Sequence, residues 1–298
     1  MVNIVRGILG VLTVIYAFMF GKDYKESAQN GRLASEEEGP LKPAIIGFIA
    51  NFGDTLGIGS FAPIVAMSKF SKMKIHDKQI PGMLNVSCCI PVVTEALLMT
   101  TAIAVEPITL VSMLAAAGVG SYIGAGIISK MDEKKIQLVM GIALLATAIL
   151  MFLGLPWVNL MPGGGNEIGL SGAKLVIGVV GNFVLGALMT AGIGLYAPCM
   201  ALVYFLGMSP KVAFPIMMGS CAVLMPIASA KFIKEGEYPR KASLAITIGG
   251  VLGVFVAFYL VKSLPMDILK VLVIIVILYT SYTMLKPVLS KKGNAKQA

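Results

Sequence analysis

The chain has 298 residues, of which 57% are hydrophobic and 13% are charged, and its formal net charge is +9. Apolar runs of about 20 residues recur along it, each long enough to cross the ~30 Å hydrocarbon core of a bilayer. This composition excludes an ordinary soluble domain and predicts an all-α polytopic membrane protein. The lysines and arginines lie in short loops between apolar runs, a pattern typical of membrane orientation and not of nucleic-acid binding.

The first apolar run covers residues 2–20. Arg6 near its start also fits a cleaved signal peptide, but no A-x-A-like cleavage site follows, so we expect a retained transmembrane helix. The mixed polar residues 21–43 predict a loop, which closes an N-terminal segment 1–43. Eight further apolar runs follow, over residues 44–70, 80–101, 107–128, 136–155, 174–206, 212–230, 242–261 and 266–286.

One short stretch of the chain occurs twice. Residues 55–63 read TLGIGSFAP and residues 190–198 read TAGIGLYAP, so six of nine positions are identical at an offset of 135 residues. Each copy places glycines where an apolar helix would otherwise continue. An internal repeat of this kind predicts two corresponding halves of a membrane transporter. We assign repeat one to 44–155, a Gly-rich external linker to 156–173, repeat two to 174–287 and a basic tail to 288–298.

The basic residues predict how the two interrupted runs lie in the membrane. The loops 21–43, 71–79, 129–135 and 231–241, with their flanks, and the tail carry three or four Lys or Arg each, whereas 102–106 and 156–173 carry none. Basic loops stay in the cytoplasm. They all fall on one side only if 44–70 and 174–206 each enter the membrane and return. We therefore expect one extra N-terminal helix and two inverted repeats, each a re-entrant broken-helix hairpin plus three transmembrane helices. The N-terminus is then external and the C-terminus cytoplasmic.

The glycines and prolines of the repeat predict an anion site. Glycine permits the positive φ of a tight reversal, and proline is favoured in the first turn of a helix. Two half-helices would then begin near mid-membrane, where free N–H groups and the positive end of the helix dipole attract an anion. The alternative is that these glycines only allow close helix packing. The predicted substrate-binding residues are Thr55, Gly57, Ile58, Gly59, Ser60 and Pro63 in copy one, and Thr190, Gly192, Ile193, Gly194, Tyr196 and Pro198 in copy two.

Two acidic residues lie deep in apolar runs. Asp54 precedes the first GIG and Glu95 lies in the run 80–101, and ionisable residues in a membrane usually mark functional sites. We expect Asp54 or Glu95 to take up a proton that couples to substrate movement. In the alternative interpretation, Asp54 caps a half-helix and Glu95 lies at the outer interface. Asn51 and Asn85 are further coupling candidates, because Asn85 shares a helix face with Glu95 and Asn51 precedes Asp54 by three residues.

These motifs resemble the TauE/SafE family of sulfite and organosulfonate transporters. The resemblance rests on the two G-I-G…P copies and on Gly207-Met-Ser-Pro-Lys-Val-Ala213, and it extends over about 44–286. The family run is usually G-x-G-G-G, which is shortened here to Gly57-Ile-Gly59-Ser60 and Gly192-Ile-Gly194-Leu195. The resemblance implies a secondary transporter that moves sulfite, thiosulfate or a sulfonate across a prokaryotic inner (plasma) membrane. It further implies export, which we expect to be coupled to protons or to the membrane potential.

Other functions fit the sequence less well. A membrane protease needs a histidine at membrane depth, but the one histidine, His76, lies in a basic loop, and Cys88 and Cys89 do not form a C-x-x-C motif. We therefore expect no enzyme, no cofactor and no metal site. A cation-coupled anion importer or channel, with Asn51 and Asp54 serving the cation, is the second possibility, and a purely structural subunit is the third. The expected partners are a small anion and the lipid bilayer.

Overall fold

The computed structural model describes residues 2–56, 58–99, 104–155, 157–158, 160, 165–192 and 194–260, together with scattered positions between 271 and 289. Over these residues the chain is helical, without β-strands. The helices are α1 (Val2–Gln29), α2 (Leu41–Thr55), α3 (Phe61–Phe70), the 3-10 helix η1 (Asp77–Gln79), α4 (Ile80–Met99), α5 (Pro107–Ile128), α6 (Glu133–Leu153), α7 (Gly172–Met189), α8 (Tyr196–Phe205), α9 (Pro210–Glu235) and α10 (Arg240–Leu260).

The length and apolar character of the helices confirm a polytopic membrane protein. Seven of the described helices are long and apolar enough to cross a bilayer: α1, α4, α5, α6, α7, α9 and α10. The helix α3, with 10 residues, is apolar but too short. About half of the last predicted run, 266–286, lies outside the described residues, and the positions within it that are described are helical.

The first helix is longer than its apolar residues predict. It runs from Val2 to Gln29, so the predicted loop at 21–43 is wrong over its first nine residues. The continuation carries a Lys22–Glu26 pair at 3.9 Å, with the i,i+4 spacing that supports a solvated helix face. Hydrophobicity alone marks the membrane-embedded part of a helix and misses a polar extension that projects from it.

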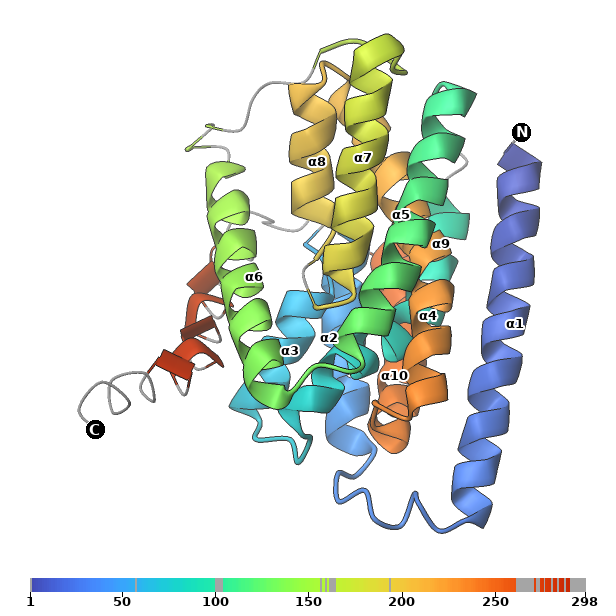
Figure 1. The fold of residues 1–298 in the computed structure, drawn as a ribbon, viewed down its shortest axis with the longest axis vertical. Coiled ribbons are helices and arrows are strands. Elements are labelled where there is room, and N and C mark those ends of the chain that lie inside the picture. The colour runs from blue at the N-terminus through green and yellow to red at the C-terminus, as the bar shows by residue number, and fades with distance from the viewer. Residues whose placement is uncertain are drawn as a thin grey trace.

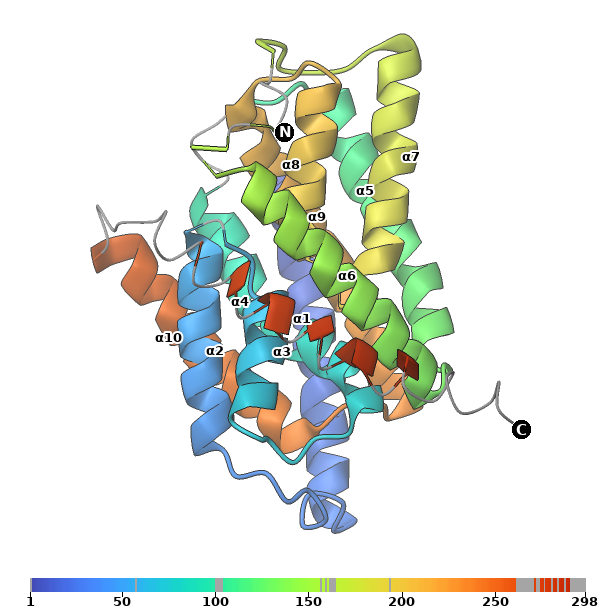
Figure 2. The same cartoon turned by 90° about the vertical axis from the view of Figure 1, so that its left-hand side faces the viewer.

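The two interrupted runs form two helix pairs at opposite ends of the bundle. The pair α2 and α3 lies in the lower part of Figure 1, and the pair α7 and α8 lies in the upper part, an arrangement that Figure 2 repeats after a 90° turn. The basic loops after α1, α3, α5 and α9 gather at the lower end, while the residues just before α7 and the segment joining α8 to α9 lie at the upper end. We call these the basic end and the opposite end.

The helices of the two sequence halves make corresponding contacts, so the packing pattern is the same when the two halves are exchanged. The helix α2 packs on α10 as α7 packs on α5, and α4 packs on α10 as α9 packs on α5. The helices α4 and α9 pack against each other at the centre. Each of these contacts joins one half of the sequence to the other, so the bundle is a single interlocked body.

Glycines allow the closest of these contacts. In α10, a methyl group added at Gly249 or Gly253 would collide with the carbonyl oxygen of a residue in α2. In α5, a methyl group at Gly120 or Gly124 would collide in the same way with a carbonyl of α7. Both pairs have the spacing of four residues that brings membrane helices into backbone contact. The two broken segments are therefore each held by a rigid glycine-lined helix of the other half.

Candidate functional site

The two breaks are related by the same sequence offset as the repeat. The helix α3 covers Phe61–Phe70 and α8 covers Tyr196–Phe205, so both helices begin and end 135 residues apart. Pro63 and Pro198 are the third residues of these helices. Each of these helices therefore begins just before its proline, as predicted, because proline needs no N–H partner in a first turn.

Among the described residues, left-handed backbone occurs at one glycine in each break. Gly59 has φ of +88° and Gly192 has φ of +97°. An L-residue with a side chain rarely adopts such angles, so glycine is required at both positions. Gly59 is the second glycine of its GIG motif, whereas Gly192 is the first glycine of its own. Gly57 and Ile193, two predicted site residues, lie outside the described residues.

The start of α3 has no cap from the side chain of its own N-cap residue, although the Ser60 N–H bonds the Asp54 carboxyl group. Ser60 occupies the N-cap position but its hydroxyl makes no capping hydrogen bond. The first intrahelical bonds are equivalent in the two copies: the N–H of Ile64 donates to Ser60 O at 3.0 Å, and that of Cys199 donates to Leu195 O at 2.9 Å. The N–H groups before these positions have no helix carbonyl to bind, which is the geometry that binds anions.

A buried polar cluster connects the two breaks. The hydroxyl of Tyr196, the first residue of α8, donates to Glu95 Oε2 of α4 at 3.2 Å. Asp54, in the last turn of α2, is hydrogen-bonded to the N–H and the hydroxyl of Ser60 and to Tyr196, and it interacts electrostatically with Glu95. The exposed fractions of Asp54, Glu95 and Tyr196 are only 2%, 1% and 5%. The structure therefore brings both predicted carboxyl groups to one place, where they meet the second copy of the repeat.

Two oxygens near this cluster have no hydrogen-bond donor within the described structure. They are Glu95 Oε1 and Asn51 Oδ1, both on fully buried residues. The Asn51 amide nitrogen donates to Gly47 O at 2.9 Å, which fixes the side-chain orientation. Buried polar atoms are normally partnered, so these two oxygens are the places at which a proton, water or solute would be stabilised.

Three cysteines belong to the same cluster, which the sequence did not predict. Cys88 interacts with Asn51, Asp54 and Ser60, and Cys221 interacts electrostatically with Asp54, Glu95 and Cys199. All of these thiols are free and buried. Cys221 also lies 3.6 Å from the Met189 sulfur at the end of α7. The three thiols come from α4, α8 and α9, and only the tertiary fold brings them together.

Other predicted site residues are engaged elsewhere. The Thr55 hydroxyl donates to Asn51 O at 3.0 Å and the Thr190 hydroxyl donates to Ala187 O at 2.6 Å, so both close their own helix ends. Asn85 precedes Glu95 by ten residues on α4, or about 15 Å along the helix axis. Ile58 is buried, whereas Gly59, Gly194 and Pro198 are half-buried. Among the described residues no group of three His, Cys, Asp or Glu side chains is arranged to hold a metal ion.

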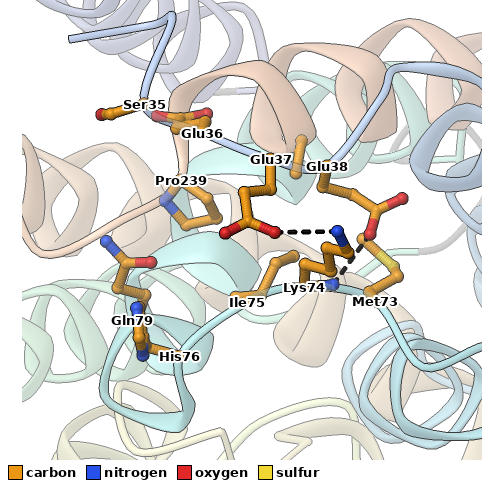
Figure 3. Close-up of a pocket in the computed structure, with 11 residues that line it drawn as sticks. Ser35, Glu36, Glu37, Glu38, Met73, Lys74, Ile75, His76, Gln79 and Pro239 are labelled. Atoms are coloured by element: carbon orange, nitrogen blue, oxygen red, sulfur yellow. Dashed lines mark hydrogen bonds and ion pairs between the residues drawn. The ribbon is translucent and has the colours of Figure 1, made fainter.

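A separate cavity of about 500 Å³ opens at the basic end. Figure 3 shows it between the acidic segment 36–38, the loop after α3 and the start of α10. Lys74 Nζ pairs with Glu37 Oε2 at 2.8 Å, and the Lys74 N–H donates to Glu38 Oε2 at 2.8 Å. The hydrogen bond from Lys74 holds the pKa of Glu37 below its usual value. Glu36 accepts from the N–H groups of Arg240 and Lys241, so the acidic segment ties together three elements at this end.

The fold and the site together define a polytopic helical membrane protein whose centre is built from broken helices, the construction in which many transporters bind their solutes. The model of the sulfite exporter TauE/SafE family matches residues 2–151 and 174–298. The chain belongs to this family, and its membrane transporter character follows. The unmatched segment 152–173 nearly coincides with the predicted linker. Comparison with curated proteins and with solved structures gives no match.

Proposed function

We propose that the protein is a secondary transporter that moves a small sulfur oxyanion, such as sulfite, thiosulfate or a sulfonate, across the plasma membrane. The observation that carries the proposal is the pair of half-helix starts, α3 and α8, at one offset and beside one buried polar cluster. The N–H groups of Phe61 and Ala62 and those at the start of α8 would bind the oxyanion without a lysine. The direction that we propose is export, in agreement with the description of the family.

In this proposal the helix pairs α2–α3 and α7–α8 are re-entrant hairpins of two inverted repeats. The placement of the pairs at opposite ends of the bundle supports this architecture, as does the exchange of contacts between the halves. At 15 and 18 residues, α2 and α7 exceed the half-helix length of ~12 residues expected for a hairpin arm, and α3 and α8 are shorter than it. We therefore infer asymmetric hairpins with a long entering and a short returning arm. The basic end faces the cytoplasm.

The carboxyl groups of Asp54 and Glu95 supply the coupling in our proposal. An anion beside two ionised carboxylates would be repelled, and a dry site of this kind would not hold three like charges. The oxyanion therefore binds when Asp54 and Glu95 carry protons. The Tyr196 hydroxyl at the start of α8 is hydrogen-bonded to Glu95. A change in the protonation of Glu95 would therefore change this bond and link proton release to movement of the second hairpin.

Flux measurements with purified protein in proteoliposomes test this proposal. We expect sulfite or thiosulfate flux that depends on an imposed proton gradient, and loss of that dependence in Asp54→Asn and Glu95→Gln. Glu37→Gln is the matched control, because it neutralises an exposed carboxylate at the basic end and leaves the cluster intact. Flux of none of the three anions would refute the function, and unchanged pH dependence in both cluster variants would refute the coupling.

A cation-coupled anion importer or channel is the alternative function. The unpartnered Asn51 Oδ1, adjacent to Asp54, is an oxygen of the kind that holds sodium at broken helices. In the same liposomes, an imposed sodium gradient would then drive anion uptake while a proton gradient would not. Asn51→Asp and Asn51→Ala would change the sodium dependence in opposite directions.

A further inference from the structure

A second hollow lies at the basic end and is lined by residues outside the two broken segments. It is a groove of about 560 Å³ between α1, α5 and α9. Three lysines line it, one from α1 and two from the last turns of α9: Lys22, Lys231 and Lys234. Phe18 and Tyr122 form its apolar walls. We call it the α1–α9 groove.

The charge of the groove is unbalanced toward the positive. Lys231 lies 4.2 Å from the ring centre of Tyr122, and neither Lys231 nor Lys234 pairs with a carboxylate of the described structure. Asp23, which also lines the groove, accepts hydrogen bonds from Arg240 Nε at 2.8 Å and from the Tyr238 hydroxyl. Glu26 lies 3.9 Å from Lys22 and is the one remaining carboxylate in the lining. An anion in this groove would therefore meet ammonium groups that lack a partner.

An apolar stripe continues from the groove toward the middle of the bundle. Val11, Val14 and Phe18 share one face of α1 by their i, i+3 and i+7 spacing. Their exposed fractions are 61%, 69% and 72%, although α1 packs on α9 and α4 with its other face. Such an apolar stripe would not stabilise a soluble anion, whereas an acyl chain would pack along it.

The lysines lie where the apolar parts of their helices end. Lys231 and Lys234 lie in the last turns of α9, and Lys22 follows the apolar part of α1. Tyr122 beside Lys231 completes the combination of aromatic ring and ammonium that is typical of a membrane interface. Basic pockets between transmembrane helices at this depth bind the headgroups of anionic lipids.

We infer that the α1–α9 groove binds an anionic phospholipid. Its phosphate lies among Lys22, Lys231 and Lys234, and one acyl chain follows the stripe of α1. The bound lipid fills the space that α1 leaves against α5 and so attaches the N-terminal helix to the two-repeat body. This site is independent of the transported solute and of the direction of transport.

Native mass spectrometry of the purified full chain tests the site with dioleoyl phosphatidylglycerol as the probe and dioleoyl phosphatidylcholine as the neutral reference. We expect phosphatidylglycerol to remain bound and phosphatidylcholine to dissociate. The variant Lys22→Gln/Lys231→Gln/Lys234→Gln should lose phosphatidylglycerol affinity by roughly 100-fold, because each lysine near an anionic surface contributes about fivefold. The control Lys25→Gln/Lys130→Gln/Lys134→Gln removes the same charge from exposed lysines at the same end and should bind normally.

Two outcomes would overturn the inference. Equal lipid binding by the groove variant and the control variant would show only diffuse attraction to the basic end. Displacement of the bound lipid by inorganic phosphate at millimolar concentration would identify a site for a soluble anion. Gel filtration establishes that both variants are folded, and the single variant Lys231→Gln should show an intermediate loss of about fivefold. Sulfite flux is not a readout here, so failure of this site leaves the proposed transport function standing.

Discussion

A single added methyl group at Gly59 tests the geometry of the first break. Gly59 has φ of +88°, and no atom of the described structure lies within 4 Å of a Cβ built there. The variant Gly59→Ala therefore adds backbone strain without a steric clash. Left-handed backbone disfavours an L-residue by roughly 1–2 kcal/mol, which corresponds to a fall of about 2–8 °C in the melting temperature.

Gly194→Ala is the matched control for this change. An added Cβ at Gly194 also meets no described atom within 4 Å, but the residue is not among the described glycines with positive φ. Thermal unfolding of the purified proteins, followed by gel filtration of the soluble fraction, should leave Gly194→Ala at the wild-type melting temperature. Gly192→Ala should be destabilised about as much as Gly59→Ala, because its backbone is also left-handed and the atom 2.8 Å from its Cβ is Met140 Cε, the flexible end of a side chain that can move away. Equal melting temperatures for Gly59→Ala and Gly194→Ala would refute the reasoning.

Two further predictions concern single hydrogen bonds. Glu106 caps α5 through the N–H of Thr109, which lowers the pKa of Glu106. Its stabilising contribution is present at neutral pH and lost as the pH falls below ~4, so Glu106→Gln should flatten this part of the stability–pH curve, and an unchanged curve would contradict the cap. In α4, Pro91 cannot donate to Ser87 O, which instead accepts from the Thr247 hydroxyl at 2.8 Å. Thr247→Val should lower the free energy of unfolding by about 1–3 kcal/mol, and Pro91→Ala should rescue it by restoring a backbone donor; a rescue that fails would contradict this assignment.

The breaks could be predicted from the sequence because they depend on local chemistry. Glycine and proline act through their own φ angles and missing groups, so their spacing in 55–63 and 190–198 predicted where α3 and α8 begin. The all-helical membrane fold followed from hydrophobicity for the same reason. The polar end of α1 was missed, since an extension into water carries no hydrophobic signal.

The content of the polar cluster depends on contacts between distant segments. Asp54 and Glu95 stood out singly because a carboxyl group is rare in an apolar run. Their partner Tyr196 lies 101 residues after Glu95, and nothing in the spacing joins the two. The thiols of Cys88, Cys199 and Cys221 resembled ordinary small core residues until the packing of α4, α8 and α9 placed them beside Asp54. The individual carboxyl groups could be predicted from the sequence, whereas their grouping with Tyr196 and the thiols could be seen only in the fold.

The central claim is that two broken helices enter from opposite faces of the membrane and meet at an anion site. Labelling of introduced cysteines with a membrane-impermeant reagent tests it most directly, because the four native cysteines are buried. We predict that Lys42→Cys and His76→Cys, on either side of the first break, both react only from the cytoplasm. Ser171→Cys and Ser209→Cys, on either side of the second break, should both react only from outside. Reaction of the two members of either pair from opposite faces would contradict the account.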